Sequence, residues 1–159
     1  MTGASAEPGT SDVWFYHLQR ASLAETLPRL VVKARGAGWR VAIRTTGEER
    51  RDALDDLLWT FEDESFLPHV PETDPQAADE TVVIQAGTGD LNAPDALLLV
   101  DGAALPEDLG RYRRVILIFD GGDDDAVAEA RVRWKAVKAA GHRASYWAQD
   151  EDGRWVKKA

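Results

Sequence analysis

The sequence contains no cysteine, which excludes a disulfide framework, thiolate chemistry and any zinc site built on cysteine. It also lacks an apolar run close to the ~20 residues that a membrane span requires. The N-terminus does not show the charged-then-apolar pattern of a secretory signal. We therefore expect a cytoplasmic protein that makes no contact with a membrane.

Signatures of nucleotide binding and bond chemistry are also missing. There is no GxxxxGK[ST] loop, no GxGxxG after the first expected strand and no GxSxG elbow. His17, His69 and His142 have no partner at metal-ligand spacing, and we expect structural roles for them. The sequence therefore predicts no catalytic site and no cofactor.

The segment 119–125, FDGGDDD, lies where a strand leads into a helix, which is the usual anion site of α/β domains. Its four carboxylates would oppose a phosphate, although they can hold Mg²⁺. Consecutive acids at a helix start are more often caps and partners of the helix dipole. A nucleotide-binding or Mg-dependent enzyme on a Rossmann-like fold stays open as the alternative.

The composition indicates one globular domain. The 159 residues are 44% hydrophobic and 30% charged, which is typical of a folded chain. We assign residues 12–159 to this domain and residues 1–11, small and polar, to a flexible tail. The net charge of −9 argues against direct binding to nucleic acid. Residues 131–159 nevertheless carry eight Lys or Arg against three acids, a local +5 that leaves −14 elsewhere.

The order of apolar patterns indicates an α/β fold. Continuous apolar runs are typical of strands that are buried on both faces of a parallel sheet. The predicted fold is an open, mostly parallel sheet flanked by helices, Rossmann-like but without a nucleotide site. We expect strands at 12–18, 39–43, 81–85, 96–100, 114–119 and 142–149, a short edge piece at 154–157, and helices at 23–35, 48–59 and 123–140.

The last of these helices carries an unusual face. Arg131, Trp134, Lys135 and Lys138 follow the spacing i, i+3, i+4, i+7, so they share one side of the helix. No acid lies three or four residues from the three cations, and their mutual repulsion costs roughly 0.5 kcal/mol. This pattern indicates a docking surface for an acidic partner with an apolar end. The alternative is an ordinary solvated helix whose Trp134 packs into the core.

Several stretches together resemble the chi subunit of bacterial DNA polymerase III. They are FYHL at 15–18, GWRV at 38–41, LDDLLWTF at 54–61 followed by SFLPH at 65–69, NAPD at 92–95, Phe119-Asp120, and ARVRWK at 130–135 with Gly141. The resemblance implies an open α/β fold without a nucleotide. It also implies a non-catalytic adaptor, because the family links the clamp loader of the polymerase to single-stranded-DNA-binding protein.

The resemblance assigns one site to the basic helix. The family binds the acidic C-terminal tail of single-stranded-DNA-binding protein, and that tail ends in an apolar dipeptide with a phenylalanine. By match to the family, the residues that bind the tail are Arg131, Trp134, Lys135 and Lys138, with Phe119 and Asp120 beside them. The best-known members have tyrosine at the position of Trp134, which predicts a wider or shallower slot here.

The resemblance assigns a second site to the LWTF and SFLPH motifs. By match to the family, Trp59 and Phe66, with neighbouring Phe61 and Leu67, contact the psi subunit of the clamp loader or a helicase that uses the same face. Aromatic residues in a loop interrupted by proline suit an interface, since aromatics dominate interface energies. The alternative is that these side chains only cover the edge of the sheet.

Overall fold

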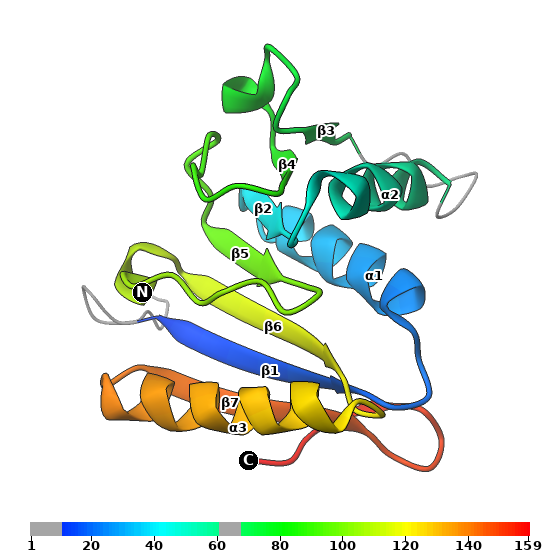
Figure 1. The fold of residues 1–159 in the computed structure, drawn as a ribbon, viewed down its shortest axis with the longest axis vertical. Helices are drawn as coiled ribbons and strands as arrows, with labels where there is room; N and C mark the ends of the chain where they lie inside the picture. The colour runs from blue at the N-terminus through cyan, green and yellow to red at the C-terminus, as the bar shows by residue number, and fades with distance from the viewer. Residues whose placement is uncertain (1–10, 61–67) are drawn as a thin grey trace.

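The computed structural model describes residues 11–60 and 68–159. Its strands are β1 (Asp12–Leu18), β2 (Val41–Arg44), β3 (Val70–Pro71), β4 (Val82–Gln85), β5 (Ala96–Leu99), β6 (Arg114–Asp120), β7 (Arg143–Gln149) and β8 (Trp155–Lys157). They form one open sheet in the order β3-β4-β2-β5-β6-β1-β7-β8 (Figure 1). Every pair is parallel except β7 with β8, which confirms the predicted open, mostly parallel α/β fold.

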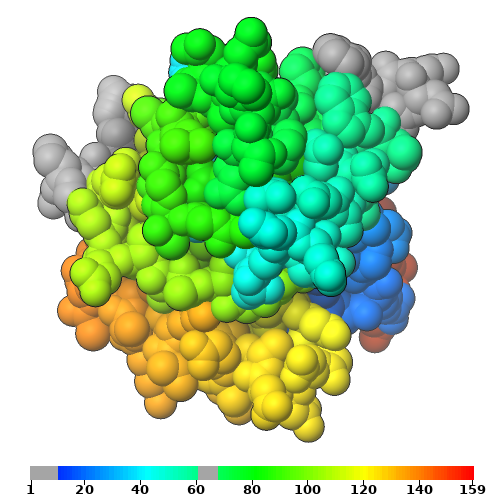
Figure 2. Space-filling view, turned by 45° about the horizontal axis from the view of Figure 1, so that its top comes forward, coloured from blue at the N-terminus to red at the C-terminus, as the bar shows by residue number. Residues whose placement is uncertain are grey.

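Helices cover both faces of this sheet. The described α-helices are α1 (Leu23–Gly36), α2 (Glu48–Trp59) and α3 (Asp124–Ala139). The apolar sides of α1 and α2 pack on one face of the strands, and α3 packs on the other with the connection between β5 and β6. In the space-filling view, α3 forms the surface coloured yellow to orange, and this connection is yellow-green (Figure 2). Burial on both faces explains the continuous apolar runs.

α1 begins at the predicted residue, and side-chain caps explain why. The Ser22 hydroxyl accepts a hydrogen bond from the Glu25 backbone, and the Glu25 carboxylate accepts one from the Ser22 backbone, which completes a capping box. Pro28 lies inside the helix and is buried against the core, although proline removes one helical hydrogen bond. The helix extends to Gly36, one residue beyond the predicted end.

The ends of α3 also agree with the sequence. The Asp123 carboxylate accepts hydrogen bonds from the backbone N–H groups of Asp125 and Ala126, so it is the N-cap. Gly141 follows the helix with φ of 87°, a left-handed conformation that glycine adopts without steric cost. These two residues fix where the basic helix begins and ends.

No strand or helix was predicted between residues 59 and 81, and this prediction was incomplete. β3 pairs with β4 there, and a 3-10 turn follows at Ala77–Asp79. Both elements are too short to produce a periodic sequence pattern, and Pro71 lowers the strand signal because proline cannot donate to a ladder. Among the helices that the structure describes, none has the length and apolar character needed to cross a membrane.

Candidate functional site

α3 presents a ridge of three cations, Arg131, Lys135 and Lys138, that we name the basic ridge. All three side chains are exposed, and none forms an ion pair with any acid in the described part of the chain. Arg133 differs, because its guanidinium lies 3.2 Å from Glu129 Oε1 and donates to the backbone oxygen of Ala103. The basic ridge therefore carries charge that the described residues do not neutralise.

Trp134 lies beside the basic ridge and is half-buried. Its ring packs edge-on against Phe15 at a centroid distance of 5.2 Å and against Tyr146 at 6.0 Å. Lys138 Nζ lies 5.5 Å from the Trp134 ring centroid, within range of a cation–π interaction. The indole thus contributes to the core and also borders the basic ridge, so the two sequence-based alternatives for Trp134 are not exclusive.

Trp134 belongs to an aromatic cluster that draws on four elements: β1, β6, α3 and β7. Phe119 lies 6.1 Å from Tyr146 and 5.2 Å from His17, between ring centroids. His17 Nδ1 lies 2.5 Å from the Tyr146 hydroxyl oxygen. Phe119 is therefore brought near Trp134, with Tyr146 between the two rings.

Tyr146 and His17 were not predicted from the sequence to belong to the site. Phe15 pairs with Tyr146 in the parallel register of β1 and β7, which places Tyr146 on the α3 face of the sheet. Had the pairing of β1 with β7 been predicted, Tyr146 would have been placed on the same face as Phe15, because paired residues point to the same face. His17 lies two residues beyond Phe15 and so on the same face of β1.

Two charged residues act on the ionisable groups of the cluster, Arg131 on Tyr146 and Asp120 on His17. Burial raises the pKa of Tyr146, and the positive charge of Arg131 opposes this rise. Burial lowers the pKa of His17, and the negative charge of Asp120 opposes this fall.

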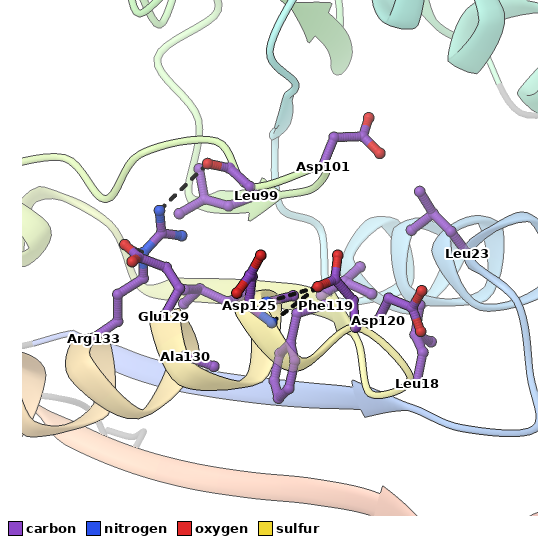
Figure 3. A pocket seen from close by; sticks show the side chains of 15 residues that line it. Leu18, Leu23, Leu99, Asp101, Phe119, Asp120, Asp125, Glu129, Ala130 and Arg133 are labelled. Carbon is purple, nitrogen blue, oxygen red and sulfur yellow. Dashed lines mark hydrogen bonds and ion pairs between the residues drawn. The ribbon is translucent and has the colours of Figure 1, made fainter.

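Asp120 lines a cavity of about 530 Å³ beside the first half of α3 (Figure 3). Apolar side chains such as Leu99 and Leu117 line its floor. Its acidic lining residues are Asp101, Asp120, Asp123, Asp125 and Glu129. None of Arg131, Trp134, Lys135 and Lys138 lines this cavity, whereas Phe119 borders both the cavity and the aromatic cluster.

The cavity lies at the carboxyl ends of β5, β6 and β1, where nucleotide-binding α/β domains hold phosphate. Here the acidic lining opposes a phosphate, and the Asp123 carboxylate caps α3. Within residues 11–60 and 68–159, no group of three or more His, Cys, Asp or Glu is arranged to hold a metal ion. The five acidic side chains disfavour a phosphate in this cavity, which the cation Arg133 also lines.

Trp59 lies at the last position of α2 with 51% of its surface exposed. Its ring lies 4.2 Å from the ring of His69, which is buried. Phe61, Phe66 and Leu67, the other residues predicted for the second interface, lie outside the described residues. Of that predicted surface, the structure therefore describes Trp59.

Comparison with known proteins gives concordant matches. A family model described as DNA polymerase III chi subunit, HolC, matches residues 11–145. A curated protein of Rickettsia prowazekii (strain Madrid E), named probable DNA polymerase III subunit chi, is 24% identical over 115 residues. The aligned region covers 66% of this chain and 67% of that relative. The family match includes α3 and the basic ridge and ends just before Tyr146.

Proposed function

The chain belongs to the DNA polymerase III chi subunit family, and from this premise we propose that it is a non-catalytic adaptor that binds an acidic peptide tail on α3. The proposed tail is the C-terminus of single-stranded-DNA-binding protein, which the adaptor would link to the clamp loader of the polymerase during replication. The observation that carries the proposal is the basic ridge, whose three exposed cations have no ion pair with a described acid.

The charges support an acidic ligand. Three like charges on one helix face repel one another until an anion neutralises them. Arg131 suits a carboxylate because a guanidinium can donate two parallel hydrogen bonds to it. Lys135 and Lys138 would attract the acidic residues that precede the tail end, at a range set by ionic screening.

The aromatic cluster supports an apolar end on that ligand. Trp134 is half-buried beside the basic ridge, and Phe119 and Tyr146 lie on the same side of the sheet. Aromatic rings pack favourably edge-on or offset against one another, so a terminal phenylalanine would find suitable neighbours there. A peptide that combines acids with a terminal phenylalanine matches both halves of the site.

A titration with the isolated tail peptide tests the proposal. We expect micromolar binding, about −8 kcal/mol, to the unmodified chain by calorimetry or fluorescence anisotropy. Lys135→Ala or Arg131→Ala should weaken binding by about 1–3 kcal/mol, since each removes a hydrogen bond to a charged group. Lys33→Ala is the matched control, because Lys33 is an exposed lysine on α1, across the sheet. Equal affinities for all of these proteins would remove α3 as the tail site.

A second partner is proposed for the exposed end of α2. Trp59 has the size and exposure of an interface anchor, and family resemblance assigns its position to the psi subunit or to a helicase. Trp59→Ala should abolish co-purification with that partner while leaving binding of the tail unchanged. Leu91→Ala is the control, because Leu91 is 47% exposed on a different segment. Retained co-purification of Trp59→Ala would contradict this assignment.

A further inference from the structure

We propose that the Tyr146 hydroxyl, positioned by His17, recognises the free terminal carboxylate of the peptide bound on α3. The inference rests on the proposed function and names two residues that contribute to its selectivity. It assigns to the site a donor from β7 and a positioning residue from β1, neither of which belongs to the basic helix. Tyr146 lies outside the region that the family model matches.

The position of Tyr146 is the first argument. Its ring packs against Trp134 and Phe119, at 6.0 Å and 6.1 Å between centroids, and the side chain is half-buried. Arg131 lies three residues before Trp134 on α3, so it shares a helix face with the ring that Tyr146 contacts. A carboxylate that is paired with Arg131 would therefore meet the Tyr146 hydroxyl beside the aromatic rings.

The contact with His17 is the second argument. A hydroxyl has one hydrogen to donate and two lone pairs that accept. When His17 Nδ1 carries a proton, it donates to the Tyr146 oxygen across 2.5 Å and leaves the hydroxyl hydrogen free for a carboxylate. When Nδ1 is unprotonated, it accepts that hydrogen instead. A bound carboxylate thus favours the form in which His17 donates.

The close packing of His17 is the third argument. A Cβ at Gly121 would lie 2.0 Å from His17 Nε2, so the imidazole fills the space that the absent side chain leaves. Neighbouring rings of Phe119 and Tyr146 enclose it on other sides, at 5.2 Å and 5.8 Å between centroids. A ring held in this way fixes the direction of the Tyr146 hydroxyl.

The proposed site recognises two groups of the peptide's last residue, its terminal carboxylate and its side chain. The terminal carboxylate and the terminal side chain share a Cα, so both lie within a few ångströms of each other. Arg131 and Tyr146 would bind the carboxylate while Trp134 and Phe119 contact an apolar side chain. An amidated peptide keeps the side chain but replaces one acceptor oxygen by an NH₂ group, which cannot accept from Tyr146.

Four titrations test the inference, with the tail peptide as its free acid and as its C-terminal amide against the unmodified chain and Tyr146→Phe. We expect the unmodified chain to prefer the acid by at least tenfold. Tyr146→Phe should lower that preference by about fivefold to tenfold, with little change in affinity for the amide. An unchanged acid-to-amide ratio would overturn the inference.

Two variants of His17 test its positioning role by the same ratio. His17→Leu removes the donor and should lower the acid-to-amide ratio as Tyr146→Phe does. His17→Asn offers an amide N–H near the Nδ1 position and should restore part of the ratio. A ratio that stays unchanged in both variants would contradict the role of His17. Thermal unfolding of each variant identifies any that does not fold, and Tyr146→Phe still decides the main claim.

The outcomes separate this inference from the proposed function. The proposed function fails if neither peptide binds the unmodified chain. It also fails if Lys135→Ala and the unmodified chain bind the free-acid peptide with equal affinity. If the acid binds and Lys135→Ala weakens it, while Tyr146→Phe keeps the full preference for the acid, only the role of Tyr146 fails.

Discussion

The fold leaves no room for a side chain at Gly121. A Cβ there would lie 2.0 Å from His17 Nε2 and 2.6 Å from the backbone oxygen of Leu18. The second contact is with backbone, which cannot move aside as a flexible side chain can. The turn from β6 into α3 therefore requires glycine at this position.

We predict that Gly121→Ala lowers the free energy of unfolding by about 1–3 kcal/mol, because an overpacked site forces a backbone shift. Urea unfolding monitored by tryptophan fluorescence measures it. Gly36→Ala is the control, since Gly36 is helical and a methyl group added to it would have no atom within 4 Å. That variant should be neutral or more stable by up to ~1 kcal/mol. Similar losses in both variants would contradict the steric argument.

A buried polar network joins β2 to the segment before β6. Arg44 Nη2 lies 2.6 Å from Asp90 Oδ1 and 3.1 Å from the Tyr112 hydroxyl, and Tyr112 donates to the other oxygen of Asp90. Arg44, Asp90 and Tyr112 are 5%, 8% and 2% exposed, so each depends on the others for its hydrogen bonds. Burial, followed by the hydrogen bond to Asp90, raises the pKa of Tyr112 from 10.0 to about 12.

This shift predicts a loss of stability in alkali. The folded chain holds the Tyr112 proton more tightly than the unfolded chain, so the contribution is complete below pH 10 and is lost between pH 10 and about 12. A shift of this size corresponds to about 3 kcal/mol. Denaturant unfolding at pH 9, 10.5 and 11.5 should show a steeper decline for the unmodified chain than for Tyr112→Phe. If the stability of the unmodified chain and that of Tyr112→Phe fell in parallel with pH, this prediction would be contradicted.

At the scale of elements, the acids at the start of α3 have unequal roles. Asp123 accepts two backbone hydrogen bonds as the N-cap, whereas Asp124 lies in the first turn with an exposed side chain. We predict that Asp123→Ala costs about 1 kcal/mol of stability and Asp124→Ala clearly less. Thermal and urea unfolding give both values. Because neither acid belongs to the basic ridge, a large loss of tail binding in Asp123→Ala at a temperature where it is folded would contradict our placement of the site.

The strands and helices were predictable because their patterns are local. The strand at 96–100 is an unbroken apolar run, and it forms β5 at Ala96–Leu99, buried on both faces. The helix from 123 to 140 carried its own cap and stop signals and forms α3 between those residues. β3 and the turn at Ala77–Asp79 were missed, since two or three residues carry no period.

The candidate site was only partly predictable, because half of it depends on strand pairing. The basic ridge comes from one helix, so its spacing was visible in the sequence. Tyr146 and His17 meet only because β7 and β1 are paired in a particular register, although 129 residues separate them. Phe119 borders both the aromatic cluster and the acidic cavity, whereas Asp120 lines the cavity, which forms where several strands end and so has no local sequence pattern.

At the scale of the molecule, the two proposed interfaces lie on helices that cover opposite faces of the sheet. Trp59 ends α2, and the basic ridge runs along α3 (Figure 1). A partner on one face leaves the other accessible, which suits an adaptor that must hold two proteins at once. Binding of the tail and of the second partner should therefore be independent.

The charge distribution of the whole chain predicts what it does not bind. The net charge is −9, while residues 131–159 carry a local +5, so the area around the basic ridge belongs to a positive stretch of an otherwise acidic chain. A short acidic tail contacts that area alone, whereas a DNA strand, with a charge at every nucleotide, would extend over the acidic surface and be repelled.

We predict that a fluorescently labelled oligo-dT of about 20 nucleotides shows no anisotropy change with micromolar protein near physiological salt. The tail peptide should bind under the same conditions and should weaken as salt rises, because screening acts on exposed charges within a Debye length of about 8 Å. Lys135→Ala should reduce this salt dependence, since one fewer cation contributes. Tight binding of the oligonucleotide without any partner protein would contradict this prediction. It would mean that attraction to the local cations exceeds repulsion by the acidic residues.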